Sequence, residues 1–340
     1  MSVDDLNSIA RAMVAPGKGI LAADESNATI TKRFDKLGIE SNEENRRAYR
    51  DALFSTPGLG EHISGVILYD ETIRQSACDG TPFPKLLERL GMLPGIKVDT
   101  GAKPLANAPD EKVTEGLDGL RERIAEYVQM GAKFAKWRAV ITIGDGIPSD
   151  YCIKANAHAL ARYASLCQEG GLVPIVEPEV LMDADNDIDT CFQVTERTHR
   201  AVFAELAAQR VAFEGMILKP NMAISGKKCE RQASPQEVAE KTIQLLRRTV
   251  PAAVPGIAFL SGGQSAEVAT KHLSLMNQMG PHPWQLSFSY GRALQDPALL
   301  AWKGDSSNVE SAQQALAFRS RLNGAARDGS YKPDMEQQAA

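Results

Sequence analysis

The chain has 340 residues, 43% of them hydrophobic and 24% charged, which is enough for a sizeable core in one large domain or two ordinary ones. Its net charge of −5 argues against a general nucleic-acid-binding protein, because such proteins need a basic surface. No apolar run approaches the roughly 20 residues that span a bilayer, and the N-terminus lacks the apolar segment of a signal peptide, so we expect a soluble, cytoplasmic protein that binds no membrane.

Short segments rich in β-forming residues alternate along the chain with segments of helical periodicity. A helix is predicted first, at 3–13, and a closing helix at 308–322. The eight predicted strands are Gly19–Ala23, Gly65–Tyr69, Gly95–Val98, Phe134–Ile143, Leu172–Glu177, Gly215–Lys219, Gly256–Leu260 and Leu286–Phe288. Helical patterns between them include Gly119–Met130, Ala155–Gln168, Asp189–Ala208, Gln236–Arg247 and Ala266–Met279.

The predicted strands are apolar on both faces, as buried parallel strands are. Eight βα units in about 300 residues predict an α/β fold, a TIM (β/α)8 barrel with additional N-terminal and C-terminal helices. An open doubly wound sheet is the alternative, but its glycine fingerprint is missing, since Gly58-x-Gly60 precedes a strand and lacks a third glycine. We assign residues 1–324 to a single domain and expect 325–340 to be a polar, mobile tail.

The cysteines and histidines, five of each, are scattered. No CxxC pair occurs, so we expect reduced thiols, most of them half-buried apolar side chains, rather than a disulfide framework. No HxH or HExxH spacing occurs either, so the sequence offers no metal site.

Charged residues stand at or near the carboxyl ends of the predicted strands: Asp24, Lys97, Lys136, Arg138, Glu177, Glu179 and Lys219. Residues two apart in a strand point to the same side, so the pairs in strands four and five project together. Buried charges are costly and therefore rare in strands unless they are paired or functional. A structural ion-pair network in the barrel mouth is the alternative, but convergence on the end where TIM-barrel active sites form favours a site.

Two of these lysines suggest covalent chemistry. A lysine beside another cation in a partly desolvated site has its pKa lowered from about 10.4, and its free amine adds to a carbonyl. Strands four and six are close around a barrel, so Lys136 and Lys219 are candidates for such a pair. Glu177 or Glu179 would move protons while water leaves the carbinolamine, and Asp24 would act as base on the hydroxyl that becomes an aldehyde. Together these groups predict a retro-aldol enzyme.

Two glycine-containing loops follow the last two strands. Residues 260–265 read Leu-Ser-Gly-Gly-Gln-Ser before a helix, and 289–292 read Ser-Tyr-Gly-Arg. Glycines let backbone N–H groups approach an anion, and these loops are the usual phosphate site of a TIM barrel, although ordinary turns are the alternative. A second anion site is suggested at Ser26, Thr29, Lys32, Arg33 and Lys97. For 29–33 the alternative is a solvated helix face.

Several segments are similar to those of class I fructose-bisphosphate aldolases of the animal and plant type. They are residues 14–26, 43–47, 134–138 (Phe-Ala-Lys-Trp-Arg), 174–179, 218–221 (Leu-Lys-Pro-Asn), 259–265 and 288–294. The resemblance implies a TIM barrel without metal or cofactor. It also implies reversible cleavage of a sugar phosphate, fructose 1,6-bisphosphate, to dihydroxyacetone phosphate and glyceraldehyde 3-phosphate in glycolysis and gluconeogenesis, by a protein that is often a homotetramer.

By motif, Lys219 resembles the family's Schiff-base lysine, Glu177 its acid/base and Asp24 the residue at the C4 hydroxyl, with Lys136 and Glu179 as electrostatic support. The residues similar to those that hold the 1-phosphate are Ser261, Gly262, Gly263, Ser289, Gly291 and Arg292. Those similar to the distal phosphate site are Ser26, Arg33 and Lys97, with Thr29 where the family has serine, and Arg138 joins the substrate-binding set.

One departure concerns the C-terminus. Vertebrate members end in a tyrosine that reaches the active site, whereas this chain ends Glu-Gln-Gln-Ala-Ala and its last tyrosine is Tyr331. We expect an active enzyme in which the tail contributes less. The competing interpretations are a Schiff-base aldolase or transaldolase with another sugar phosphate, a metal-dependent aldolase, which the scattered histidines disfavour, and a non-catalytic scaffold on the same fold.

Overall fold

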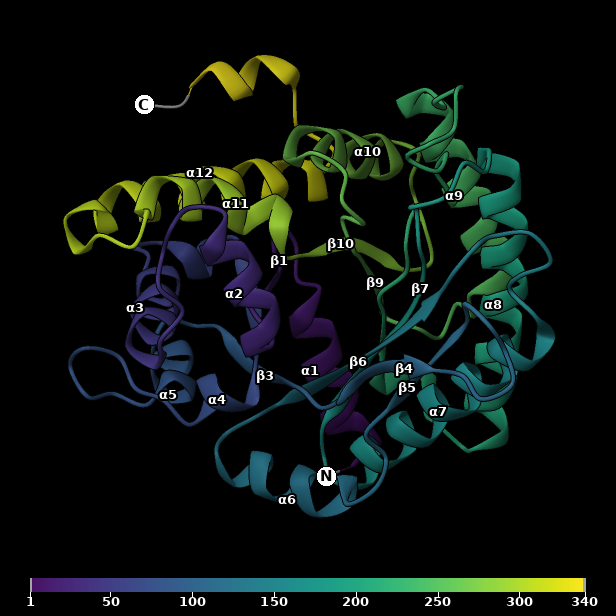
Figure 1. The fold of residues 1–340 in the computed structure, drawn as a ribbon, viewed down its shortest axis with the longest axis horizontal. Helices are drawn as coiled ribbons and strands as arrows, with labels where there is room; N and C mark the ends of the chain where they lie inside the picture. Colours follow the sequence, from purple (N-terminus) through teal and green to yellow (C-terminus); the bar gives the residue numbers. More distant parts are fainter. Residues whose placement is uncertain (1, 339–340) are drawn as a thin grey trace.

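The eight segments predicted as strands all belong to one closed barrel of parallel strands. Figure 1 shows the computed structural model, which describes residues 2–338. The barrel strands are β1 (Gly19–Ala22), β2 (Ile63–Leu68), β3 (Leu93–Lys97), β6 (Phe134–Ile141), β7 (Val173–Val180), β8 (Ile217–Leu218), β9 (Gly256–Phe259) and β10 (Gln285–Tyr290). Each lies beside its neighbours in chain order, and β1 pairs with β10 to close the barrel. The predicted TIM barrel is confirmed.

Side chains of the barrel strands alternate between an inner and an outer apolar layer, as the two-residue period of a strand requires. The inner layer holds Ile20, Phe134, Ile175 and Ile217, and it continues into the buried face of α1 (Val3–Met13). Helix α1 therefore covers the apolar end of the barrel interior, where the strands begin.

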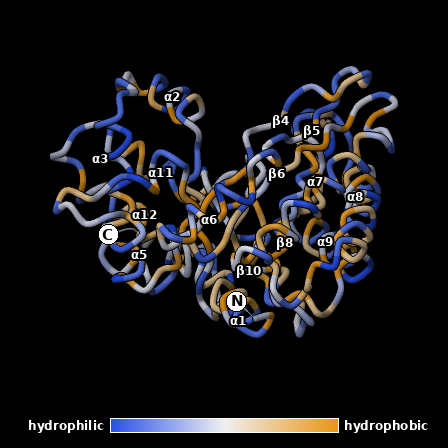
Figure 2. The backbone as a smooth tube through the Cα atoms, turned by 90° about the horizontal axis from the view of Figure 1, so that it is seen from below, coloured by the Kyte–Doolittle hydropathy of each residue, from blue (hydrophilic) through white to orange (hydrophobic). Residues whose placement is uncertain are grey.

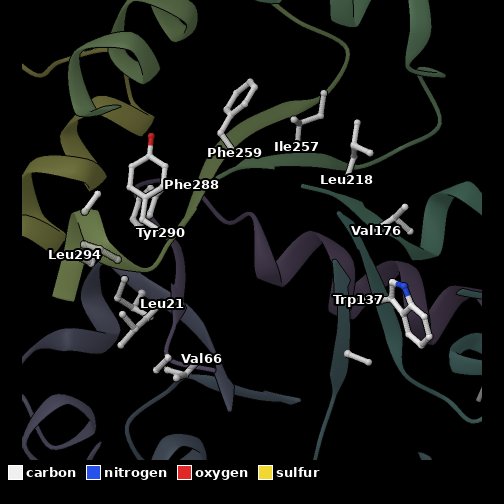
Figure 3. Close-up of a cluster of buried hydrophobic side chains, with 14 of the residues drawn as sticks. Leu21, Val66, Trp137, Val176, Leu218, Ile257, Phe259, Phe288, Tyr290 and Leu294 are labelled. Atoms are coloured by element: carbon white, nitrogen blue, oxygen red, sulfur yellow. The ribbon is translucent and has the colours of Figure 1, made fainter. Parts of the chain in front are cut away.

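The outer layer explains why the strands look apolar on both faces. The strands that carry the inner side chains also carry side chains that point outward, among them Leu21, Trp137, Val176 and Leu218. These outward side chains pack with the surrounding helices in a second buried cluster. Figure 3 shows part of this layer. Both faces of each strand are thus shielded from water, which favours continuous rather than alternating hydrophobic runs.

The other helices surround the barrel on the outside, and the last two follow the last strand (Figure 1). They are α2 (Asn27–Asp35), α3 (Glu43–Phe54), α4 (Asp70–Ile73), α5 (Phe83–Arg89), α6 (Leu120–Gln129), α7 (Asp150–Glu169), α8 (Ile188–Ala208), α9 (Pro235–Thr249), α10 (Ala266–Gln278), α11 (Arg292–Trp302) and α12 (Val309–Arg327). Short 3-10 segments are η1 (Leu59–Glu61), η2 (Phe213–Gly215), η3 (Ser306–Asn308) and η4 (Pro333–Gln338). All predicted helical patterns are helices, but α7 begins earlier than predicted because the Ser149 hydroxyl accepts from the N–H of Cys152 and caps it.

A short antiparallel hairpin, β4 (Gly101–Pro104) and β5 (Lys112–Glu115), was not predicted. Its strands are short and mostly exposed, so they carry no clear alternation of apolar residues. Figure 2 shows α2 on one side and this hairpin on the other side of the barrel. Among the described residues, no helix is long and apolar enough to cross a membrane.

The C-terminal region continues beyond the predicted domain boundary. Helix α12 runs through residue 324 to Arg327, and Tyr331 is buried. Glu336 of η4 forms an ion pair with the buried Arg319 of α12 and accepts a hydrogen bond from the Tyr331 hydroxyl. The described part of the tail is therefore tied to α12, and the mobility of 325–340 stays a prediction.

Candidate active site

The alternation inside the barrel places charged side chains directly above the inner apolar layer. Lys136 is two residues beyond Phe134, and Lys219 is two residues beyond Ile217, so each points the same way as its apolar predecessor. The same rule carries Glu177 inward from Ile175. Asp24, which follows Ala22 of the inner layer, is buried with them.

These four side chains form one ion cluster. Lys136 Nζ lies 2.7 Å from Asp24 Oδ2 and 3.4 Å from Glu177 Oε2. The other oxygen of the same carboxylate, Glu177 Oε1, lies 3.4 Å from Lys219 Nζ. Glu177 therefore stands between the two lysines that were paired from their strand positions, and its Oε2 makes no hydrogen bond to any described residue.

Burial and neighbouring charges shift the pKa values of the two lysines in opposite directions. Burial lowers the pKa of Lys219, and the positive charge of Lys136 lowers it further against the opposing effect of Glu177. Burial alone would also lower the pKa of Lys136, but the carboxylates of Asp24 and Glu177 outweigh it and hold that pKa above its usual range. Lys219 is thus the lysine closer to offering a free amine, while Lys136 stays protonated.

The charge of Asp24 follows from the same cluster. Burial raises the pKa of Asp24, but the ammonium groups of Lys136 and Lys219 outweigh it and lower the pKa to about 2. The carboxylate is therefore ionised at neutral pH. A buried lysine with a lowered pKa, beside one carboxylate that can move a proton and near a second, ionised carboxylate, is suited to amine addition to a carbonyl.

Two further ion pairs flank the cluster. Arg138 Nε donates to Glu179 Oε2, and Lys97 Nζ lies 2.8 Å from Asp99 Oδ1. Asp99 was not singled out from the sequence, although it is buried and accepts from the backbone N–H of Gly101 and of Arg138. Its position directly after an apolar strand is the same signal that identified Asp24.

A cavity of about 540 Å³ opens above these groups, and every predicted site residue except Gly263 lines it. Its lining residues are Ala22, Asp24, Glu25, Ser26, Thr29, Lys32, Arg33, Lys36, Lys97, Asp99, Gly101, Ala102, Lys136, Arg138, Val140, Glu177, Glu179, Lys219, Leu260, Ser261, Gly262, Ser289, Gly291 and Arg292. Both α2 and β4 contribute, so the two elements on opposite sides of the barrel in Figure 2 form the walls of the cavity.

One end of the cavity is formed by the glycine loop after β9. Gly262 and Gly263 have φ values of +57° and +81°, a left-handed conformation that glycine adopts without strain. Ser289, at the end of β10, is buried, and its hydroxyl has no hydrogen-bond partner among the described residues. Gly263 is not among the lining residues, but the NH2 group of Arg292 would be 3.2 Å from a Cβ atom built on it. An anion in this loop would meet backbone N–H groups, a hydroxyl and a guanidinium.

The other end is formed by the first turns of α2. The Ser26 hydroxyl caps the helix by accepting from the N–H of Thr29, and the two hydroxyl oxygens lie 3.1 Å apart. Arg33 also lines the cavity, but its guanidinium is already paired with Glu25 at 2.5 Å and with Asp296 at 2.7 Å.

Two other cations of the α2 region line the same end. Lys32 and Lys36 are exposed and one helical turn apart. Lys32 was noted from the sequence but Lys36 was not, because only the direction of α2 brings it to the cavity.

Tyr331 does not line the cavity, and within residues 2–338 neither does any other residue of the tail. The same described part of the chain contains no group of three or more His, Cys, Asp or Glu side chains arranged to hold a metal ion.

Comparisons with known proteins show the family to which the chain belongs. The family model described as fructose-bisphosphate aldolase class-I matches residues 5–340. A probable fructose-bisphosphate aldolase class 1 of Xanthomonas campestris pv. campestris is 60% identical over 98% of this chain and its own full length. Fructose-bisphosphate aldolase 6, cytosolic, of Arabidopsis thaliana is 52% identical over 97% of this chain and 92% of the relative. A solved structure of fructose-bisphosphate aldolase from Plasmodium falciparum, in complex with TRAP and a small-molecule inhibitor, superposes with a TM-score of 0.96 at 49% identity, covering 97% of this chain and 96% of that one. The chain therefore belongs to the class I fructose-bisphosphate aldolase family.

Proposed function

We propose that this protein is an enzyme that reversibly cleaves fructose 1,6-bisphosphate to dihydroxyacetone phosphate and glyceraldehyde 3-phosphate, in glycolysis and gluconeogenesis, through a Schiff base on Lys219. The observation that carries the proposal is the buried cluster in which Glu177 lies 3.4 Å from both Lys219 and Lys136. It supplies one lysine with a lowered pKa and one that stays protonated.

The first step is addition of the Lys219 amine to the C2 carbonyl of the open-chain sugar. The carbinolamine that results must lose water, and the departing hydroxyl needs a proton. Glu177 is the group within reach of Lys219, and its Oε2 makes no hydrogen bond to a described residue. Glu177 therefore takes the proton that the Lys219 ammonium gives up when it becomes a free amine and later delivers it to the departing hydroxyl. The hydroxyl leaves as water, and an iminium ion forms at C2.

The second step breaks the bond between C3 and C4. Asp24, ionised because its pKa is lowered to about 2, takes the proton of the C4 hydroxyl. The electrons of the C3–C4 bond then form the C2–C3 double bond, and the π electrons of the iminium group move to its nitrogen. Glyceraldehyde 3-phosphate leaves and an enamine stays on Lys219. Lys136, 2.7 Å from Asp24, orients the carboxylate throughout, and Glu179 and Arg138 hold each other beside it. Protonation of C3 and hydrolysis then release dihydroxyacetone phosphate.

The two ends of the cavity suit a substrate with two phosphate groups. The glycine loop from Ser261 to Gly263, with Ser289, Gly291 and Arg292, would hold the 1-phosphate next to the Schiff base. Ser26, Thr29 and Lys97 would hold the distal phosphate, together with Lys32 and Lys36. Because Arg33 lines the cavity but already pairs with two carboxylates, we assign it a supporting role at this site.

The test is a trapping experiment. The protein is incubated with dihydroxyacetone phosphate, reduced with borohydride in the presence of EDTA, and mapped by mass spectrometry. We expect one adduct, on Lys219, and none in the Lys219→Met variant. An adduct on Lys136, or one that EDTA prevents, would contradict the assignment of the nucleophile or the absence of a metal.

We also propose a cytoplasmic location and a homotetrameric assembly. The word cytosolic in the name of the Arabidopsis relative supports the first, and the second rests on family resemblance. Light scattering coupled to gel filtration tests the assembly, since a tetramer has four times the 36.8 kDa mass of the chain; a mass of 36.8 kDa would refute it.

A further inference from the structure

A second cation reaches the glycine loop at one end of the cavity. The Nζ atom of Lys227 would lie 2.9 Å from a Cβ atom on Gly263, and the NH2 group of Arg292 would lie 3.2 Å from the same point. Lys227 comes from the loop after β8, whereas Arg292 begins α11 after β10. Cations from two different loops therefore converge over one glycine of the proposed 1-phosphate site.

The backbone that carries Lys227 is held in place by a neighbouring loop. The N–H groups of Gly226, Lys227 and Lys228 donate to carbonyl oxygens within residues 182–186, at 2.8, 2.7 and 3.0 Å. Gly226 is needed for this close pairing, because a Cβ atom there would lie 2.2 Å from the carbonyl oxygen of Ala184. The position of Lys227 over the glycine loop is thus built into the fold.

In this structure the Lys227 ammonium has only a weak partner. Its Nζ lies 2.9 Å from Asp183 Oδ1, with the two side chains 42% and 66% exposed. An ion pair this open to water competes poorly with a doubly charged anion. Two positive groups facing one point also repel each other until an anion lies between them.

An independent feature of the same cavity points to a ligand. Ser289 is only 1% exposed within the cavity lining, and its hydroxyl has no hydrogen-bond partner among the described residues. Buried polar groups normally have hydrogen-bond partners, so an unpaired hydroxyl that lines the same cavity as Gly262 and Arg292 indicates a site that an anion completes.

We propose that Lys227 is a further substrate-binding residue, which leaves Asp183 and pairs with the 1-phosphate group opposite Arg292. This inference rests on the proposed function and names a residue that no sequence motif singled out. One guanidinium neutralises half of a phosphate dianion, and Lys227 supplies the second positive charge. Because the phosphate takes no part in bond breaking, Lys227 stabilises bound substrate and transition state equally, and its loss raises KM rather than lowering kcat.

The test replaces Lys227 with methionine and uses Lys228→Met as the matched control. Lys228 is exposed in the same loop, and its substitution removes the same charge. In cleavage of fructose 1,6-bisphosphate we expect Lys227→Met to raise KM about tenfold, the loss of one charge-assisted contact, with kcat within about twofold of wild type. Lys228→Met should change neither value by more than about twofold.

A binding measurement on a protein that cannot form the Schiff base tests the role of Lys227 separately from the proposed function. Dihydroxyacetone phosphate is titrated by calorimetry into Lys219→Met, which cannot form a Schiff base, and into the same protein carrying Lys227→Met or Lys228→Met. We expect about tenfold weaker binding only when Lys227 is absent. Equal affinities in all three proteins would overturn the role of Lys227. A wild-type protein that forms no adduct on Lys219, while its phosphate affinity still depends on Lys227, would overturn the proposed function alone.

Discussion

Replacing Lys136 with methionine removes the cation that lies between Asp24 and Glu177 but keeps most of the side-chain volume. The two carboxylates then share the cluster with Lys219 as the remaining nearby ammonium. All of these side chains are at most 11% exposed, so water does little to screen the change. Loss of one partner from a buried ion pair destabilises a protein by roughly 3–5 kcal/mol.

The contribution of Asp24 can be worked out from its pKa. The fall from 3.8 to about 2 on folding corresponds to roughly 2–3 kcal/mol at neutral pH. A carboxyl group whose pKa is lower in the folded state stabilises the folded protein at pH values above its unfolded-state pKa. For Asp24 this stabilisation is lost as the pH falls through about 2. Without Lys136, burial is opposed only by Lys219 and Lys97, so we expect the pKa of Asp24 to rise above its unfolded value and proton uptake to favour the folded variant at acid pH. The stability difference between wild type and variant should therefore narrow as pH falls.

The assay is urea unfolding of wild type and Lys136→Met at about pH 7.5 and about pH 4.5, with Lys136→Arg as a control that keeps the charge. We expect a loss of roughly 3–5 kcal/mol at the higher pH and a smaller loss at the lower one. Cleavage by the methionine variant should fall by at least about 10²-fold, because proton transfer loses its orienting charge and the pKa of Lys219 rises. A difference within about 1 kcal/mol at the higher pH, or one that does not narrow, would refute this account of the cluster.

Three further predictions concern the nucleophile, the barrel and the tail. The initial rate of borohydride trapping should rise with pH and level off below the ordinary lysine pKa of about 10.4, because the pKa of Lys219 is lowered; a rise that continues beyond that value would contradict the burial effect. Gly95→Ala would set a Cβ atom 2.2 Å from the Phe134 ring inside the barrel, so we expect a loss of about 1–3 kcal/mol in urea unfolding, and an unchanged free energy would mean that the ring can move aside. Deleting residues 332–340 leaves the buried Arg319 without its carboxylate partner and should lower the Tm. We expect kcat to stay within about threefold of wild type, because none of the deleted residues that the structure describes lines the cavity. A large loss of activity that is selective for the bisphosphate would show that the tail reaches the site.

The local pattern of apolar residues was sufficient to predict the barrel. The strands were visible as apolar segments because each strand is covered by the interior on one face and by helices on the other. The two-residue period then determined which charges point inward, so the spacing of Lys136, Glu177 and Lys219 within their strands was enough to predict that they meet. The hairpin β4–β5 was missed because its short, exposed strands carry no such pattern.

By itself, then, the sequence determined the barrel, the inward charges and the two glycine loops, since these depend on spacing within single segments. The tertiary structure decided which groups are partners. Lys136 and Lys219 satisfy the same local rule, and only their distances to Asp24 and Glu177 give one a raised and the other a lowered pKa. Lys227 reaches the loop at 263 from a segment some 36 residues earlier in the chain. Electrostatic energies depend on distance and burial in three dimensions, and closure of the barrel sets both.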